Sequence, residues 1–427
     1  MSIVERVRRR GRKWPIVTLI VVVIVAVSLF LAQDAQTVRI RSARAASDPA
    51  FPDYIATLVG APLTHGDSYR VLQNGDEIYP AMLAAIDGAR TRVAFESFNF
   101  ISGDAADRFI DALGSAAQRG VVVRVVLDAI GTVPPPPRVE ERLREAGVEL
   151  AWFNKFGLWT FENTNYRTHR KLLVVDGQVA FTGGAGVADH WLGHAQDEEY
   201  WRDSHFRITG PVVRLLEACF FENWVESGGV DPPQLDLQQP GGATGAQSVV
   251  IWSNATGGVS NVKLLYLYSI AAARTSIDIQ SPYFILDSSV RWALADARAR
   301  GVGIRILTDG EITDAKSVKH ASRLEYQDLL DGGTRIYEYQ PTMMHVKTMV
   351  IDGAWTVFGS ANFDNRSLEL NDEITAAVAD PELAAALSTA FERDLARSRE
   401  IVSAEWRRRP WHQKIRERFW GFFGEVF

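Results

Sequence analysis

The sequence has little cysteine, little histidine and no excess of positive charge. Cys219 is the only cysteine among 427 residues, so no intramolecular disulfide can form and the fold needs no oxidising compartment, although it tolerates one. The formal charge of -6, with acidic and basic residues intermixed, gives no reason to expect nucleic acid as a partner. Because 47% of the residues are hydrophobic, we expect a folded chain of two domains or one duplicated domain.

The eight histidines include two that begin copies of one short pattern. The pattern is His, one residue, Lys, four residues, Asp. Its copies are His169, Lys171 and Asp176 in the first half of the chain, and His345, Lys347 and Asp352 in the second. Glycine follows each copy at the same interval, as Gly183-Gly184 and as Gly359. A single copy is expected by chance in on the order of one per cent of such sequences, so the doubled copy indicates a repeat.

A long apolar run lies near the N-terminus. Residues 15–32 read PIVTLIVVVIVAVSLFLA, which is just long enough to cross a bilayer as a helix. Residues 1–14 carry six basic side chains against one acid, so the positive-inside rule predicts a cytoplasmic N-terminus and an extracytoplasmic remainder. A cleaved signal peptide is the alternative, because small residues such as Ala43 and Ala45 follow, but the length of the run favours a single-pass anchor in the cell membrane. Residues 33–66 lack clear periodicity and are interpreted as a tether.

From residue 67 onward, strand-like and helix-like stretches alternate, as expected for a sheet flanked by helices. For the first unit, residues 67–229, we predict a turn at Asn74-Gly75, helices over 78–89 and 106–118, and strands over 93–100 and 121–127. For the second unit, residues 247–395, we predict strands over 248–252, 277–285 and 304–307, and helices over 262–273 and 290–299. Residues 230–246 are rich in Gly, Pro and Gln and are interpreted as a linker, and residues 396–427 form a C-terminal tail.

The repeat predicts how the two units are arranged. Gly88-Ala89-Arg90 precedes one predicted strand as Ala272-Ala273-Arg274 precedes its counterpart, so the duplication covers whole structural units. We therefore expect an α/β fold in which two similar sheet-and-helix units pack as a pseudo-two-fold pair, preceded by one N-terminal transmembrane helix.

The repeated string suits an anion more than a metal ion. His and Lys two residues apart on an extended chain point to the same face, and an ammonium group repels a metal cation. If the units pack face to face, two imidazoles and two ammonium groups can surround one phosphate. One neutral imidazole can then attack phosphorus to form a covalent phosphohistidine, while the other, protonated, supplies a proton to the departing alkoxide. The alternative is that each histidine is an ordinary core residue beside a surface lysine.

Further side chains complete the candidate site. Lys171 and Lys347 would neutralise phosphate oxygens, and Ser360 and Asn362 can donate hydrogen bonds to them, so that neither a metal nor a cofactor is required. Asp203 and Glu373 each follow their string at a similar distance and are predicted to orient the histidines, unless they are ordinary surface acids. Asp176 and Asp352 complete the catalytic strings, but each directly precedes a glycine, so capping of a turn is the favoured role.

The doubled strings with their glycines resemble the paired motifs of the phospholipase D superfamily, from about Tyr69 to about Asp380. Further stretches are similar to the bacterial cardiolipin synthases, namely Glu96-Ser97-Phe98-Asn99-Phe100, Trp201-Arg202-Asp203-Ser204-His205, Ser281-Pro282-Tyr283-Phe284 and Gly359-Ser360-Ala361-Asn362 with the residues that follow it. The resemblance implies transfer of a phosphatidyl group between two phosphatidylglycerol molecules, giving cardiolipin and glycerol. It also implies that His169 is the nucleophile and His345 the acid.

Two features depart from that family. Gly186 stands where the family usually has asparagine after the first glycine pair, and one N-terminal span is predicted where many relatives carry two. The C-terminal tail interleaves basic and aromatic residues, so it is either a helix in the interface of an anionic bilayer or an amphipathic helix packed on the protein itself.

Three functions remain open from the sequence. The first is a membrane-anchored phosphatidyltransferase of the cardiolipin synthase type, with phosphatidylglycerol as the phospholipid substrate. The second is a hydrolase that uses water as acceptor, acting on phospholipid or on nucleic acid, and the third is a silent lipid-binding protein. The strings do not separate transferase from hydrolase, because both share the phosphohistidine step and differ only in the acceptor.

Overall fold

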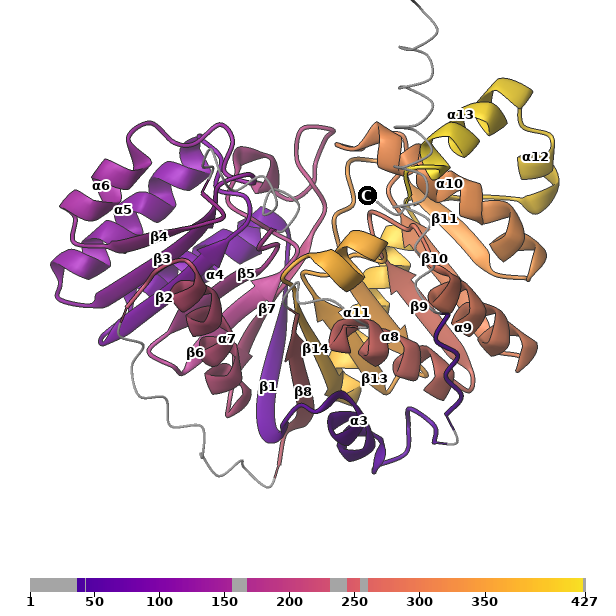
Figure 1. Ribbon diagram of the computed structural model, residues 1–427, viewed down its shortest axis with the longest axis horizontal. Coiled ribbons are helices and arrows are strands. Elements are labelled where there is room, and N and C mark those ends of the chain that lie inside the picture. The colour runs from indigo at the N-terminus through magenta and orange to yellow at the C-terminus, as the bar shows by residue number, and fades with distance from the viewer. Residues whose placement is uncertain (1–36, 43, 156–166, 231–243, 254–259, 425–427) are drawn as a thin grey trace, which may run out of the picture. The chain divides into compact units, whose positions relative to one another are not determined.

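The computed structural model describes residues 37–424 except 43, 156–166, 231–243 and 254–259 (Figure 1). Residues 40–427 belong to one compact unit, and the fold below is that of this unit. The predicted basic tail, residues 1–14, and the predicted anchor, residues 15–32, lie outside the described residues, as does most of the predicted linker, residues 230–246. None of the helices in the described part of the chain is both long and apolar enough to cross a membrane.

The first half of this unit is a seven-strand series with helices between the strands. Its elements are β1 (Leu63–Gln73), α4 (Asn74–Asp87), β2 (Arg92–Ser97), α5 (Asp104–Gln118), β3 (Val122–Asp128), α6 (Val139–Glu145), β4 (Glu149–Phe153), β5 (Lys171–Val175), β6 (Val179–Gly183), β7 (Ser204–Thr209) and α7 (Val212–Glu226). Every residue of β5 is buried, as expected for a central strand with an apolar run.

The second half repeats that series. Its elements are β8 (Ala246–Trp252), α8 (Asn261–Ala272), β9 (Ser276–Gln280), α9 (Ser288–Ala299), β10 (Gly303–Thr308), α10 (Lys316–Asp331), β11 (Arg335–Tyr339), β12 (Thr348–Ile351), β13 (Trp355–Gly359), β14 (Ile374–Ala379) and α11 (Pro381–Leu395). The remaining elements are α3 (Phe51–Val59), β15 (Ser398–Glu400), α12 (Ser403–Arg407) and α13 (Trp411–Gly421). The prediction of an α/β fold with two similar units is confirmed.

The two halves share one sheet and one core. The 15 strands run in the order β15-β11-β10-β9-β12-β13-β14-β8-β1-β7-β6-β5-β2-β3-β4, so each half has the same internal order on either side of the β8–β1 pair. β1 pairs with β8 through its first residues and with β7 through its last. The halves also pack face to face, because Phe206 of β7 stacks on Phe358 of β13 with ring centroids 3.7 Å apart.

The tether predicted for residues 33–66 is wrong in its second part. Phe51, Ile55 and Val59 are buried on one face of α3, at helical spacing, and Phe51 meets the ring of Trp355 at 5.1 Å. The run Phe51–Val59 is short, and its period was too brief to stand out in the sequence. The chain then enters β1 at Leu63, so the tether ends before Phe51.

Two local predictions also differ from the structure. Asn74-Gly75 begins α4 instead of forming a turn, and glycine is needed there because a Cβ would lie 1.9 Å from the carbonyl oxygen of Trp191. The strand predicted over 277–285 ends at Gln280, because Pro282 has no amide hydrogen to continue the ladder. The residues after Gln280 contribute Tyr283 to the wall of the site described next.

Candidate active site

His169 lies two residues before the start of β5, and its imidazole is held by the other half of the protein. The Nδ1 atom of His169 lies 2.8 and 3.1 Å from the two carboxylate oxygens of Glu373, which directly precedes β14. The backbone amide of His169 donates to the carbonyl of Asp372 at 2.9 Å. The segment that carries His169 is therefore fixed to the second half by both side chain and backbone.

His345 is held by the equivalent contacts to the first half of the protein. Its Nδ1 atom lies 2.9 Å from Oδ2 of Asp203, which directly precedes β7, and its backbone amide donates to the carbonyl of Arg202 at 2.7 Å. The predicted partners Asp203 and Glu373 therefore lie beside the histidines, but each carboxylate contacts the histidine of the opposite half. The geometry indicates that Nδ1 of each ring carries the proton and that Nε2 is left for chemistry.

The two carboxylates are themselves held by different donors. The hydroxyl of Ser360 donates to Glu373 and accepts from the amide of Ile374 at 3.0 Å. The hydroxyl of Ser360, which was predicted to bind phosphate, therefore has its proton engaged by Glu373, and the side chain is fully buried. At the equivalent place in the first half, a Cβ on Gly184 would lie 2.3 Å from Asp203, which leaves no room for a serine.

Asp203 has an aromatic donor in place of that serine. The indole Nε1 of Trp191 donates to Oδ2 of Asp203 at 2.9 Å, and the amide of Ser204 donates to Oδ1 at 2.8 Å. Sequence reasoning missed Trp191, which lies outside both strings, and no local pattern singled it out. Asp203 and Glu373 are therefore held by different hydrogen-bond donors, so the two halves of the site are not identical.

The two lysines lie beside the histidines and are almost fully buried. The Nζ atom of Lys171 donates to the carbonyl of His169 at 2.8 Å, and that of Lys347 donates to the carbonyl of His345 at the same distance. Lys347 also lies 3.0 Å from Nε2 of His345. Burial lowers the pKa of Lys171 to about 7 and that of Lys347 to about 8.

Both imidazoles are neutral at pH 7. Burial lowers the pKa of His169 to about 4, although Glu373 works in the opposite direction. Burial and the neighbouring Lys347 lower the pKa of His345 well below its ordinary value. Burial alone would raise the pKa of Glu373, but His169 and Lys171 hold it below its usual range, so this carboxyl group stays charged.

A cavity of about 630 Å³ opens over the two imidazoles. Both histidines line it, with aromatic walls formed by Phe98, Trp201 and Tyr283. Two guanidinium groups, those of Arg167 and Arg366, line it together with the carboxyl groups of Asp314 and Asp364, and Arg167 lowers the pKa of Arg366 further than burial alone does. Aromatic walls and positive charge suit a guest that is both apolar and anionic.

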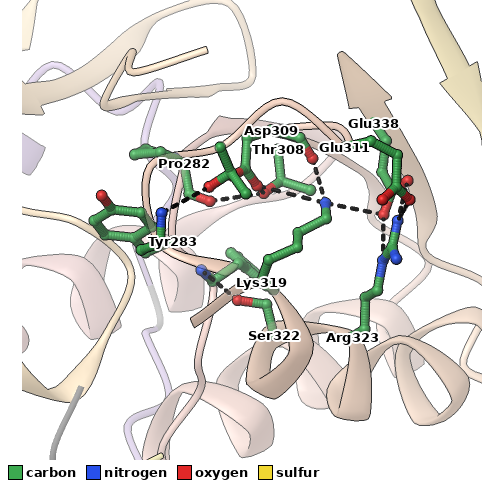
Figure 2. Close-up of polar contacts among 12 residues, drawn as sticks. Pro282, Tyr283, Thr308, Asp309, Glu311, Lys319, Ser322, Arg323 and Glu338 are labelled. Carbon is green, nitrogen blue, oxygen red and sulfur yellow. Dashed lines mark hydrogen bonds and ion pairs between the residues drawn. The ribbon is translucent and has the colours of Figure 1, made fainter. Parts of the chain in front are cut away.

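The backbone on either side of Tyr283 is held by a buried polar network (Figure 2). Thr308 donates to the carbonyl of Pro282 at 3.0 Å, and Ser322 accepts from the amide of Phe284 at 3.3 Å. Lys319 lies at the centre of the network, where its ammonium group contacts Glu338 at 2.9 Å and the carbonyl of Asp309. The network fixes the segment after β9 and thereby one wall of the cavity.

Asp176 and Asp352 do not line the cavity. Each lies at the far end of its strand, where its carboxylate accepts from the backbone at the start of the neighbouring strand, as in the 2.7 Å bond from the amide of Thr91 to Asp176. The matching bond from Thr275 to Asp352 is 2.8 Å. Asp176 and Asp352 therefore have a structural role, not a catalytic one. Their carboxylates bind the backbone at strand ends more than they cap their own turns.

Asn99 occupies the space that a side chain at position 186 would need. A Cβ on Gly186 would lie 2.8 Å from the Cβ of Asn99, and Asn99 lines the cavity. On the opposite side, Asn362 is buried, lines the cavity, and finds no hydrogen-bond partner for Oδ1 among the described residues. The first half therefore contributes one amide to the cavity, from position 99, and the second half contributes two, Asn362 and Asn371. The motif Glu96-Ser97-Phe98-Asn99 contained the first of these, but nothing in the sequence related it to Gly186.

Comparison with known proteins places this geometry in a family. The family model described as cardiolipin synthase, PLD-like domain, matches residues 82–202 and 266–395. The chain belongs to the cardiolipin synthase family of phospholipase D-like proteins. It is 32% identical to cardiolipin synthase 1 of Bacillus anthracis over 371 residues, which cover 84% of this chain and 72% of that protein. It is 33% identical to cardiolipin synthase A of Pseudomonas fluorescens over 353 residues, with 81% and 72% coverage.

The phospholipase D-like fold is also found among solved structures. The phosphatidylserine synthase of Haemophilus influenzae superposes with a TM-score of 0.67 over 88% of this chain and all of that chain. At 12% sequence identity this likeness shows the fold alone. The resemblance drawn from the doubled strings is thus confirmed at the level of the family and the fold.

Proposed function

We propose that the protein is a cardiolipin synthase, a phosphatidyltransferase that converts two phosphatidylglycerol molecules into cardiolipin and glycerol. The observation that carries the proposal is the crossed arrangement, in which each histidine over one cavity is held by a carboxylate of the opposite half. Membership of the family supports the substrate and the reaction type.

In the proposed first step, Nε2 of His169 attacks the phosphorus atom of one phosphatidylglycerol. The bond to the glycerol oxygen breaks, glycerol leaves with a proton from the His345 side, and a phosphohistidine remains. Support for this assignment comes from the difference between the two Nε2 atoms. Nε2 of His345 is engaged by Lys347 at 3.0 Å, whereas no partner for Nε2 of His169 is found among the described residues.

The proton for the leaving group is proposed to come from the Lys347–His345 pair. The two nitrogens lie 3.0 Å apart, so the ammonium proton of Lys347 already points at the imidazole. The negative charge of a bound phosphodiester raises the pKa of the imidazole and favours this transfer. In the second step, His345 takes the proton of the acceptor hydroxyl, that oxygen attacks phosphorus, and the bond to His169 breaks to give cardiolipin.

Arg167 and Arg366 line the cavity in addition to the two lysines beside the histidines, although Asp314 and Asp364 line it too, and this second pair of cations favours transfer over hydrolysis. In transfer, the acceptor phosphatidylglycerol carries a phosphate of its own, and we propose that Arg167 and Arg366 bind it. Water, the acceptor in hydrolysis, would need no second anion site. The hydrolase remains the second candidate, because both reactions pass through the same phosphohistidine.

Product identification tests the proposed function. Purified protein with labelled phosphatidylglycerol should release glycerol and form cardiolipin, also in the presence of a chelator. Arg167→Ala should shift the products toward phosphatidic acid, because water replaces an acceptor that is bound less well. Arg108→Ala, at an exposed position on α5, is the matched control and should leave the product ratio unchanged. Phosphatidic acid as the main product of the unaltered protein would assign a hydrolase instead.

The activity should follow a bell-shaped pH profile. His169 must be neutral to attack, so kcat/KM should fall as pH drops toward its pKa of about 4. Lys171 and Lys347 must be protonated, so kcat/KM should fall as pH rises past their pKa values of about 7 and about 8. Lys171→Arg should move the basic limb to higher pH, because guanidinium does not titrate in this range. A basic limb that stays in place would remove Lys171 from the titration.

Asn99 is proposed to supply the phosphate-binding amide that Gly186 lacks. Asn99→Ala should lower kcat/KM by about 10-fold or more, since a hydrogen bond to a charged group contributes about 1.5–3 kcal/mol. Asn99→Asp should be worse, because a carboxylate repels the phosphate. Steady-state kinetics on vesicles would measure both. If Asn99→Asp were as active as the unaltered protein, Asn99 would not contact phosphate.

We further propose that residues 15–32 anchor the enzyme in the cell membrane, with the catalytic unit outside the cytoplasm. The apolar run and the basic residues before it support this topology. Protease added to spheroplasts should digest the catalytic unit, and protection from that protease would contradict the proposed orientation.

A further inference from the structure

The helix α13 is packed with its polar side inward. It lies against α10 (Figure 1), and Glu417, in the middle of its inner face, is only 3% exposed. The carboxylate of Glu417 is satisfied by Arg409 at 2.7 Å. Gly421 also faces inward, where a Cβ would lie 2.4 Å from the side chain of Leu324. The inner face of α13 therefore carries a carboxylate held by Arg409 and a glycine packed on α10.

The outer face of the helix and its last turn is apolar. Trp411, Ile415, Phe419 and Phe422 are 72%, 57%, 58% and 59% exposed. Their spacing of four, four and three residues places them on one face of a helix. Across the described residues, every exposed tryptophan or phenylalanine belongs to this stripe. A surface helix in water normally has the reverse polarity, so the stripe requires a partner.

We propose that this apolar stripe inserts into the interface of an anionic lipid bilayer. Residues 403–424 contain six basic side chains and two acidic ones, in a chain whose formal charge is -6. Arg416 and Arg418 flank the stripe, where long basic side chains can reach lipid phosphates while the aromatic rings enter the acyl boundary. A second copy of the same segment is a poor occupant, because it would bring like charges together.

The position of α13 relates the proposed membrane contact to the cavity. A Cβ on Gly424 would lie 3.2 Å from Cγ2 of Ile285, two residues after Tyr283, which lines the cavity. Val318, near the beginning of α10, lines the same cavity. Docking of the stripe therefore brings a lipid surface next to a wall of the cavity. The choice of anionic lipid rests on the proposed function, whereas the inverted polarity of α13 does not.

A lipid-contact measurement at single positions tests the proposal without relying on the N-terminal segment. Cys219 is fully buried, so a cysteine introduced at the surface can be labelled selectively. Phe419→Cys and Ile415→Cys would carry an environment-sensitive fluorophore in the full-length protein with His169→Ala, so the readout does not depend on turnover. Val122→Cys, exposed at the start of β3, is the matched control. The proteins would be reconstituted in phosphatidylglycerol or phosphatidylcholine vesicles containing nitroxide-labelled lipid.

In phosphatidylglycerol vesicles, the nitroxide lipid should quench both stripe probes at least about two-fold and leave the Val122 probe unchanged. Phosphatidylcholine vesicles should give weaker quenching, and Arg416→Glu with Arg418→Glu should remove the difference between the two lipids. Stripe probes that respond only to a quencher in water would overturn the proposal. Probes shielded from both quenchers would overturn it too, because a protein partner would then cover the stripe.

Discussion

Replacing His169 by alanine should abolish the phosphohistidine and lower turnover by at least about 10⁴-fold, the loss typical of a removed nucleophile. His345→Ala should be similarly inactive on phosphatidylglycerol, because the glycerol alkoxide is a poor leaving group without a proton. The two variants should differ on a phosphodiester with a p-nitrophenolate leaving group, which departs without an acid. His345→Ala should recover the first step on that substrate, and His169→Ala should not.

The two-histidine mechanism has a matched control. His194 carries an imidazole whose side chain is 71% exposed, and His194→Ala should retain full activity. Quenching of a reaction with labelled substrate in alkaline denaturant, where the acid-labile phosphorus–nitrogen bond survives, followed by digestion at alkaline pH, would locate the phosphatidyl group on the peptide that contains His169. Label on the His345 peptide would exchange the two roles, and substantial turnover by either alanine variant would rule out the mechanism.

Glu373→Gln should lower turnover about 10³-fold or more, because glutamine can no longer hold the Nδ1 proton of His169 as a carboxylate does. Asp203→Asn should do the same through His345. Because the pairing is crossed, Glu373→Gln should block formation of the phosphohistidine although it lies in the second half. The p-nitrophenolate substrate should therefore rescue Asp203→Asn but not Glu373→Gln.

Both substitutions keep the shape of the side chain, and thermal unfolding would check that the fold survives. Ser360→Ala offers an intermediate case, since it removes a hydrogen bond to Glu373 but keeps the charge. It should cost less activity than Glu373→Gln. Rescue of Glu373→Gln by the p-nitrophenolate substrate would instead assign Glu373 to the histidine that acts as the acid. Near-normal rates in both Glu373→Gln and Asp203→Asn would remove the carboxylates from the mechanism.

The repeat and the chemistry could be predicted from the sequence because they depend on local patterns. The doubled strings indicate that the structural unit is repeated. Leu172 and Leu173 continue the first string as a buried strand, so the string also indicates which side of that strand faces the anion. The crossed pairing could not be predicted, because it joins distant residues. His169 and Glu373 are 204 residues apart, and His345 and Asp203 are 142 apart, far beyond any periodicity.

The contacts of Ser360 and Asn99 could not be predicted for a related reason. Ser360 has a hydroxyl at the expected place, but only the fold shows that Glu373 takes its proton. Asn99 was visible in a motif, yet its contact with Gly186 depends on how two loops meet. A sequence gives the donors and acceptors that are present, whereas their pairing is decided by packing.

The crossed carboxylates also bear on how a protein of this kind can arise. A single unit with one histidine and one carboxylate would leave that histidine without its partner. Two identical copies related by a two-fold axis would complete both pairs at once. We therefore infer that a self-associating single-unit ancestor preceded the fused gene. Within one chain the two copies can also differ, as they do at Gly184 beside Asp203 and at Ser360 beside Glu373.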